Sequence, residues 1–160
     1  MNDTSNSNIQ KISLLAEWLL VIFSVIVCMG VAAVIGSQQS PLWPVPGLYL
    51  IEFILISIIG VGNQLVKTSN VAFSKAFPWL SSKAITWIIV GILLPFVIFG
   101  GFSIGLFLLP ALLAFLLAGI ISDWRSTTKI ISHIGIAVMS AVIQGSLILI
   151  FNIISFPRLY

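Results

Sequence analysis

Hydrophobic residues fill four long runs of the chain, and short polar segments separate them. Two of these runs, 14–35 and 47–66, are 22 and 20 residues long. About 20 apolar residues are enough for a helix to cross a hydrocarbon layer of about 30 Å. A further run extends from about Ile130 to Ile154. Each of these three segments therefore predicts one transmembrane helix.

The remaining run, from Ala84 to Ile121, is 38 residues long. As one helix it would be about 57 Å long, nearly twice the hydrocarbon thickness. We therefore expect two helices, over about 82–99 and 103–121, joined by a tight turn at Gly100-Gly101-Phe102-Ser103, because glycine admits turn conformations that other residues resist. A re-entrant hairpin is the alternative, and the nearly full length of both arms disfavours it.

The polar segments differ in character. Residues 1–11 show no apolar periodicity and are expected to form a disordered cytoplasmic tail. Three prolines interrupt 36–46. The connection 67–83 carries apolar side chains at helical spacing, which predicts a short helix on the inner membrane surface. That helix is interpreted as a simple connector, and contact with anionic lipid or a partner helix is the less favoured alternative.

The basic residues predict how the chain is threaded. Six of the seven lie before the first run, in the connection 67–83 or after the fourth helix: Lys11, Lys67, Lys75, Lys83, Arg125 and Lys129. Only Arg158 lies elsewhere. Lys and Arg prefer the cytoplasmic side, so we expect the amino terminus inside and the carboxyl terminus outside. A single tilted helix over 84–121 would instead leave four basic residues inside and three outside. The hairpin leaves six inside and one outside, so the charge pattern independently supports it.

Composition agrees with this topology. The chain has 160 residues, of which 59% are hydrophobic and 7% charged, whereas a soluble domain carries about 25% charged residues. The expected fold is an all-α bundle of five transmembrane helices forming a single domain over 12–155 of a polytopic membrane protein. We expect it in the bacterial cytoplasmic (plasma) membrane, in contact with the lipid bilayer. No basic run is flanked by aromatic residues, so no nucleic-acid partner is expected.

Tryptophan positions support the helix boundaries. All five lie near expected helix ends, where an indole can bury its ring and keep its N–H in the headgroup region: Trp18, Trp43, Trp79, Trp87 and Trp124. The single cysteine, Cys28, lies inside the first run and is interpreted as a small packing residue.

Ionisable residues inside the runs are the first candidates for function, because a charge at the bilayer centre costs at least about 2.5 kcal/mol. Glu17 precedes Trp18 at the cytoplasmic edge and is expected to stay hydrated. Glu52 lies five residues beyond Gly47, about 7.5 Å along a helix, in the outer leaflet. The favoured interpretation is that its carboxylate reaches the outer headgroups, and a cation or proton site is the alternative.

The last helix has a polar stripe that is expected to face the bundle. It comprises His133, Ala137, Ser140, Ala141 and Gln144, and Ile134, Val138, Val142 and Leu149 form the opposite, lipid-facing side. Gln144 lies near mid-membrane and is expected to bond to another helix. The candidate intramembrane polar site is Glu52, His133 and Gln144. Small residues at four-residue spacing predict close helix packing at Ala114, Ala118, Ala137, Ala141 and Gly145.

Catalytic signatures are not supported by this topology. Ser103 lies in a G-x-S-x-G pattern, but that pattern needs a strand-to-helix elbow, and here it falls at a helical hairpin. Ser103 is also expected at the outer face, whereas His133 begins the last helix at the inner face. One histidine and one cysteine cannot build an ordinary metal site. We therefore expect no catalytic residue, no metal and no cofactor.

The favoured hypothesis is a noncatalytic subunit or accessory protein of a membrane complex, which packs against itself or other membrane proteins. The alternative is a small transporter or channel subunit that acts as an oligomer. Glu52, Gln144 and the helices containing Pro95 and Pro110 motivate it, because transporters use discontinuous helices.

Overall fold

A computed structural model describes residues 3–37, 45–68, 83–125 and 130–155. This part of the chain is all-α and contains five long helices: α1 (Asp3–Ser37), α2 (Val45–Thr68), α4 (Ala84–Gly100), α5 (Leu106–Arg125) and α6 (Ile130–Ser155). The expected all-α bundle of five helices is confirmed. The predicted surface helix in the connection 67–83 falls mainly on residues outside the described ranges.

Four of the helices are long and apolar enough to cross a membrane: Ile9–Ser37, Gly47–Thr68, Leu106–Trp124 and Ile130–Ile154. The fifth, α4, has 17 residues and is about 25 Å long. The chain is therefore an integral membrane protein with four candidate spans and one shorter apolar helix.

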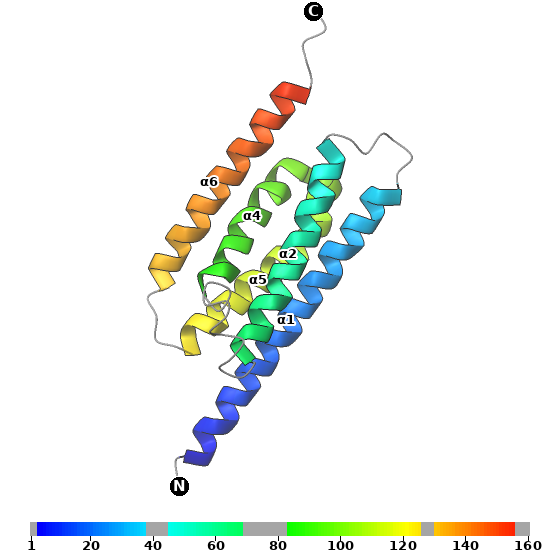
Figure 1. Ribbon diagram of the computed structural model, residues 1–160. Coiled ribbons are helices and arrows are strands. Elements are labelled where there is room, and N and C mark those ends of the chain that lie inside the picture. The colour runs from blue at the N-terminus through cyan, green and yellow to red at the C-terminus, as the bar shows by residue number, and fades with distance from the viewer. Residues whose placement is uncertain (1–2, 38–44, 69–82, 126–129, 156–160) are drawn as a thin grey trace, which may run out of the picture.

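Consecutive helices run in opposite directions, so the two ends of the bundle collect different helix termini (Figure 1). The first turns of α1 lie toward the same end as the end of α2, the starts of α4 and α6, and the end of α5. α4 is central and packs against α5, α6 and α2, while α1 packs mainly against α5 and α2. α6 lies at the periphery beside α4 (Figure 1).

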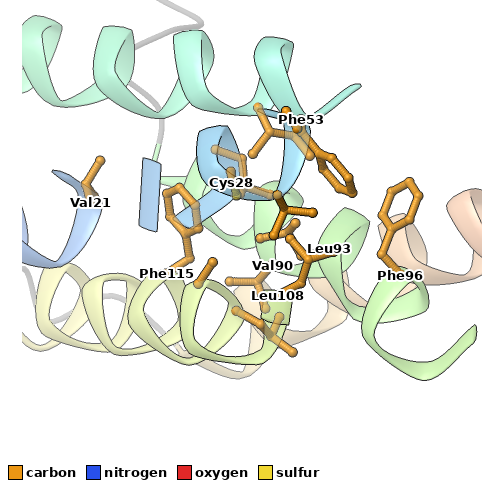
Figure 2. Packing of buried hydrophobic residues seen from close by; sticks show 14 of the residues in the cluster. Val21, Cys28, Phe53, Val90, Leu93, Phe96, Leu108 and Phe115 are labelled. Atoms are coloured by element: carbon orange, nitrogen blue, oxygen red, sulfur yellow. The ribbon is translucent and has the colours of Figure 1, made fainter. Parts of the chain in front are cut away.

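The apolar core is built mainly from four of the five helices. Figure 2 shows side chains of α1, α2, α4 and α5 meeting between the helices: Val21, Cys28, Phe53, Val90, Leu93, Phe96, Leu108 and Phe115. Among the described residues of α6, Ile148 belongs to this cluster. Cys28 is fully buried among these apolar groups, as its position in the first run indicated.

The amino-terminal segment differs from the expectation of a disordered tail over 1–11. α1 begins at Asp3, so residues 3–11 form its first turns. Between Asp3 and Gly30 the sequence contains neither glycine nor proline. Adding residues to an existing helix costs far less than nucleating a new one, so the apolar segment extends its helix through the polar residues.

The hairpin turn between α4 and α5 is made by glycine. The predicted break is present but continues through Gly105, because Gly101–Gly105 forms one wide, π-type turn and α5 begins at Leu106. Gly101 has φ +47°. A Cβ on Gly100 would lie 2.6 Å from the backbone nitrogen of Gly105, and one on Gly105 would lie 2.4 Å from the carbonyl oxygen of Val97. The turn therefore needs one glycine for its dihedral angles and two for close backbone approach.

Gly101→Ala is expected to lower the free energy of unfolding by about 1–2 kcal/mol, because L-residues resist positive φ. An added Cβ would meet nothing within 4 Å, so backbone strain alone would cause the loss. Thermal unfolding of the purified protein in detergent measures it. Gly30→Ala is the control, since its Cβ would also meet nothing within 4 Å and its φ is not positive. Equal melting temperatures for the two variants would contradict the strained turn.

Candidate functional site

Polar side chains from all five helices gather toward the end of the bundle at which α4 and α6 begin. We call this set the polar layer, and it comprises Glu17, Asn63, Gln64, Lys67, Thr86, Trp87, Ser122, Asp123 and His133. Most of these residues are buried. Buried polar groups are costly unless they are hydrogen-bonded, so their bonds decide what the layer contributes.

The first half of the polar layer centres on Glu17 of α1. The Lys67 ammonium of α2 lies 2.7 Å from Glu17 Oε1, and Gln64 Nε2 donates to the same oxygen at 2.8 Å. Lys67 Nζ also donates to Ser122 Oγ of α5 at 3.3 Å. One ion pair with its hydrogen bonds thus links α1, α2 and α5.

Glu17 was expected to be hydrated at the membrane edge, and this prediction is wrong. The residue is 1% exposed. α1 begins at Asp3, several turns before Glu17, so Glu17 lies within the helix. α2 and α5 pack against α1. Lys67 was assigned to the connection 67–83, yet it belongs to the last turn of α2, where the helix dipole favours a cation.

The second half of the polar layer centres on Asp123 of α5. Trp87 Nε1 of α4 donates to Asp123 Oδ2 at 3.0 Å, and His133 Nδ1 of α6 lies 2.8 Å from the same oxygen. The indole and imidazole rings are stacked, with centroids 6.4 Å apart. Because Asp123 follows Ser122 in the chain, the two halves adjoin. Between them, Asn63 Nδ2 donates to Thr86 Oγ1 at 3.2 Å and joins α2 to α4.

Trp87 was expected to keep its N–H in the headgroup region, but it is 4% exposed and bonded inside the bundle. Asp123 was not singled out from the sequence. It lies ten residues before the single histidine, across a short connection between two helices. Short connections place the end of one helix beside the start of the next. The spacing between Asp123 and His133 could therefore have indicated that the two side chains meet.

Glu52 and Gln144 form a separate polar contact, farther along the bundle from the polar layer. Gln144 Nε2 of α6 donates to Glu52 Oε2 of α2 at 2.9 Å. The favoured interpretation was that the Glu52 carboxylate reaches the outer headgroups. In the structure it instead bonds to a neighbouring helix. The structure brings together two of the three residues of the candidate intramembrane site, while His133 lies in the polar layer.

A cavity of about 230 Å³ lies at the end of the bundle opposite the polar layer. Its lining includes four aromatic side chains, Tyr49, Phe53, Phe96 and Phe99, together with Asn152. The Phe96 ring meets the rings of Tyr49 and Phe53 edge-on, with centroids 5.1 and 5.0 Å apart. Such edge-to-face contacts are the favoured arrangement of aromatic pairs.

Small residues allow a close approach between α4 and α6. A Cβ on Gly91 of α4 would lie 2.3 Å from the carbonyl oxygen of Ala137, and Ser140 Oγ donates to the Ile88 carbonyl at 3.1 Å. Gly145 faces Pro95. The other expected packing positions, Ala114 and Ala118, are buried, and Ala141 is half-buried. Gly91 carried no spacing signal of its own, so the sequence indicated only one side of this contact.

The sequence argued against a catalytic pair of Ser103 and His133, and the segments that carry these two residues lie apart. The turn Gly101–Gly105, which contains Ser103, lies at the opposite end of the bundle from the start of α6 (Figure 1). Within the described ranges, no group of three His, Cys, Asp or Glu residues is arranged to hold a metal ion.

Trp87→Phe is expected to lower the free energy of unfolding by about 1 kcal/mol, because Asp123 loses one hydrogen-bond donor. Denaturation followed by circular dichroism measures it. Trp124→Phe is the matched control, since Trp124 is 81% exposed and its replacement should change stability by less than about 0.5 kcal/mol. Equal effects of the two substitutions would show that the indole N–H contributes nothing.

The four long apolar helices define a multi-pass integral membrane protein. Comparisons with protein-family models, with curated proteins and with solved structures find no match to the chain.

Proposed function

We propose that this protein is a noncatalytic subunit or accessory protein of a membrane complex. One observation carries the proposal: the side chains best suited to chemistry are bonded to one another between helices. Glu17 is paired with Lys67, Asp123 contacts Trp87 and His133, and Glu52 accepts from Gln144. These groups tie five helices into one unit, so the bundle acts through its outer faces.

A groove along α4 and α6 is the surface we assign to a partner. It is lined by apolar side chains and by small or polar ones that include Ser132, Gly135 and Ser140. A Cβ on Gly135 would meet nothing within 4 Å, so another backbone can approach here. Transmembrane helices associate through small residues and interhelical hydrogen bonds because lipid offers no hydrophobic driving force. The partner is therefore a transmembrane helix of another membrane protein.

The proposed topology has five crossings, with the amino terminus in the cytoplasm. It is supported by the helix termini that carry basic residues. Lys11 near the start of α1, Lys67 at the end of α2 and Lys83 before α4 belong to segments toward one end of the bundle (Figure 1). The preference of lysine for the cytoplasmic side assigns that end to the cytoplasm. Reporter fusions after Lys75 and after Tyr160 test this, and an inside carboxyl terminus would contradict it.

Site-specific photocrosslinking in native membranes tests the partner surface. A photoreactive amino acid at Met139, in the groove, is expected to give a discrete protein adduct that mass spectrometry identifies. The control position is Phe107 of α5, which is 67% exposed and outside the groove. Protein adducts of equal yield at both positions, or lipid adducts alone at Met139, would contradict the proposed surface.

A small transporter or channel subunit is the second candidate, favoured by the Glu52 carboxylate inside α2 and its contact with α6. Flux measurements in liposomes separate the two functions. Transport that is abolished by Glu52→Gln would contradict the proposal of a subunit or accessory protein. Full function in cells that carry both Glu52→Gln and Gln144→Leu would contradict the transporter.

A further inference from the structure

The cavity opposite the polar layer has an unusual lining for a gap between apolar helices. Tyr49 and Phe53 of α2 and Phe96 and Phe99 of α4 contribute four aromatic rings to it, and Asn152 of α6 adds an amide. Figure 2 shows the rings of Phe53 and Phe96 turned toward one another. Aromatic faces carry negative electrostatic potential, so several rings around one space attract a cation.

A carboxylate lies on the same part of α2 as this aromatic lining, although it does not itself line the cavity. Glu52 precedes Phe53 in α2 and is three residues beyond Tyr49, so it is within about one helical turn, or about 5.4 Å, of the residues that line the cavity. Gln144 holds its Oε2 oxygen at 2.9 Å. No described lysine or arginine bonds to this carboxylate, whereas Glu17 is paired with Lys67. A negative charge in a medium of low dielectric acts strongly on a cation one turn away.

The cavity also has a suitable size. A cavity of about 150 Å³ is enough to bind benzene, and this one measures about 230 Å³. It accommodates a compact ammonium group with short alkyl substituents but not a large drug-like molecule. Its lining residues come from the end of α1, the start of α2, the turn after α4 and the last part of α6, so it lies close to one membrane surface.

The geometry points to a binding site for a small organic cation, a quaternary or alkylated ammonium group, between α2, α4 and α6. The four aromatic side chains surround the cation, the Glu52 carboxylate balances its charge, and Asn152 supplies a polar contact at the rim. Among the described residues the cavity and the groove on α4 and α6 share no lining residue, although Gln144 of the groove bonds to Glu52. Occupancy of the cavity is measurable on the purified protein alone.

Calorimetric titration of the purified protein in a nonionic detergent tests the site. The probes are choline and its neutral isostere 3,3-dimethylbutan-1-ol, which has the same shape without the charge. Choline is expected to bind at least about 10-fold more tightly, because the aromatic faces and the carboxylate attract only the charged probe. Equal affinities for the two probes would overturn the proposal.

Variants locate the binding. Glu52→Gln keeps the size of the side chain and an acceptor for Gln144, and it is expected to weaken choline binding about 10-fold or more. Phe96→Leu should weaken it about 3-fold or more. Phe107→Leu, on the exposed face of α5, is the control and should bind as the wild type does. Unchanged affinity in Glu52→Gln and Phe96→Leu variants with wild-type melting temperatures would overturn the site.

The same chemistry could come from a free solute or from a lipid headgroup, and nanodiscs distinguish them. Choline is titrated in nanodiscs of phosphatidylglycerol and of phosphatidylcholine. Equal affinity in both assigns a free solute to the site, and weaker apparent affinity in phosphatidylcholine assigns the headgroup. Failure to bind choline in both kinds of nanodisc would overturn the proposed cation site and would leave the proposed partner surface unaffected.

Discussion

Lys67→Met is expected to cost about 3–5 kcal/mol in the free energy of unfolding, the largest effect of any single substitution considered for this protein. The substitution removes the ammonium that lies 2.7 Å from Glu17, and the Glu17 side chain is 1% exposed. The carboxylate would stay in the bundle with a charge that the neutral amide of Gln64 does not balance. Because Lys67 also donates to Ser122, the contact between α2 and α5 would weaken as well.

Two further variants separate the ion pair from a general loss of packing. The double variant Glu17→Gln and Lys67→Met removes both charges and should recover most of the stability, since replacing a buried pair by neutral groups is often close to neutral. Lys11→Met, at an exposed position of α1, should change stability by less than about 0.5 kcal/mol. Unfolding in a denaturing detergent, followed by circular dichroism, ranks the variants. A double variant as unstable as Lys67→Met would contradict the account.

Gly91→Leu is expected to separate α6 from α4 and to cost about 3 kcal/mol or more. Even a Cβ at this position would lie 2.3 Å from the Ala137 carbonyl oxygen and 2.7 Å from Ser140 Cβ. The nearest obstacle is backbone, which cannot rotate away, so the whole helix must shift. That shift would also break the hydrogen bond from Ser140 to the Ile88 carbonyl.

A matched control is available on the opposing helix. A Cβ on Gly135 of α6 would meet nothing within 4 Å, and Gly135→Leu should leave stability within about 1 kcal/mol of the wild type. Spin-label distance measurements between α4 and α6 should show a larger separation of the two helices in the Gly91→Leu variant alone. Unchanged distances in Gly91→Leu would contradict the close crossing.

Much of the fold followed from the hydrophobic pattern. The length of the run from Ala84 to Ile121 required two helices, and the glycines at 100 and 101 marked the turn. The polar composition of 3–11 predicts disorder, whereas these residues extend α1 because helix extension depends on the absence of helix-breaking residues.

The candidate site was predictable only in part. Gln144 was expected to reach another helix, because an amide in the middle of an apolar helix needs a partner. Its actual partner, Glu52, lies 92 positions away in the chain. Glu17, Trp87 and Asp123 look like ordinary interfacial residues when each is considered beside its sequence neighbours. Their burial depends on which helices pack over them.

The sequence by itself determined the class of protein, the five long helices of the described ranges and the position of the glycine turn, because these depend on run length and local backbone preference. Only the tertiary structure decided which polar residues meet. Helix pairing brings residues together from distant parts of the chain, and no local pattern specifies the rotation of one helix against another. The pairing of Glu17 with Lys67 and the approach of Gly91 to Ala137 are therefore properties of the packed bundle.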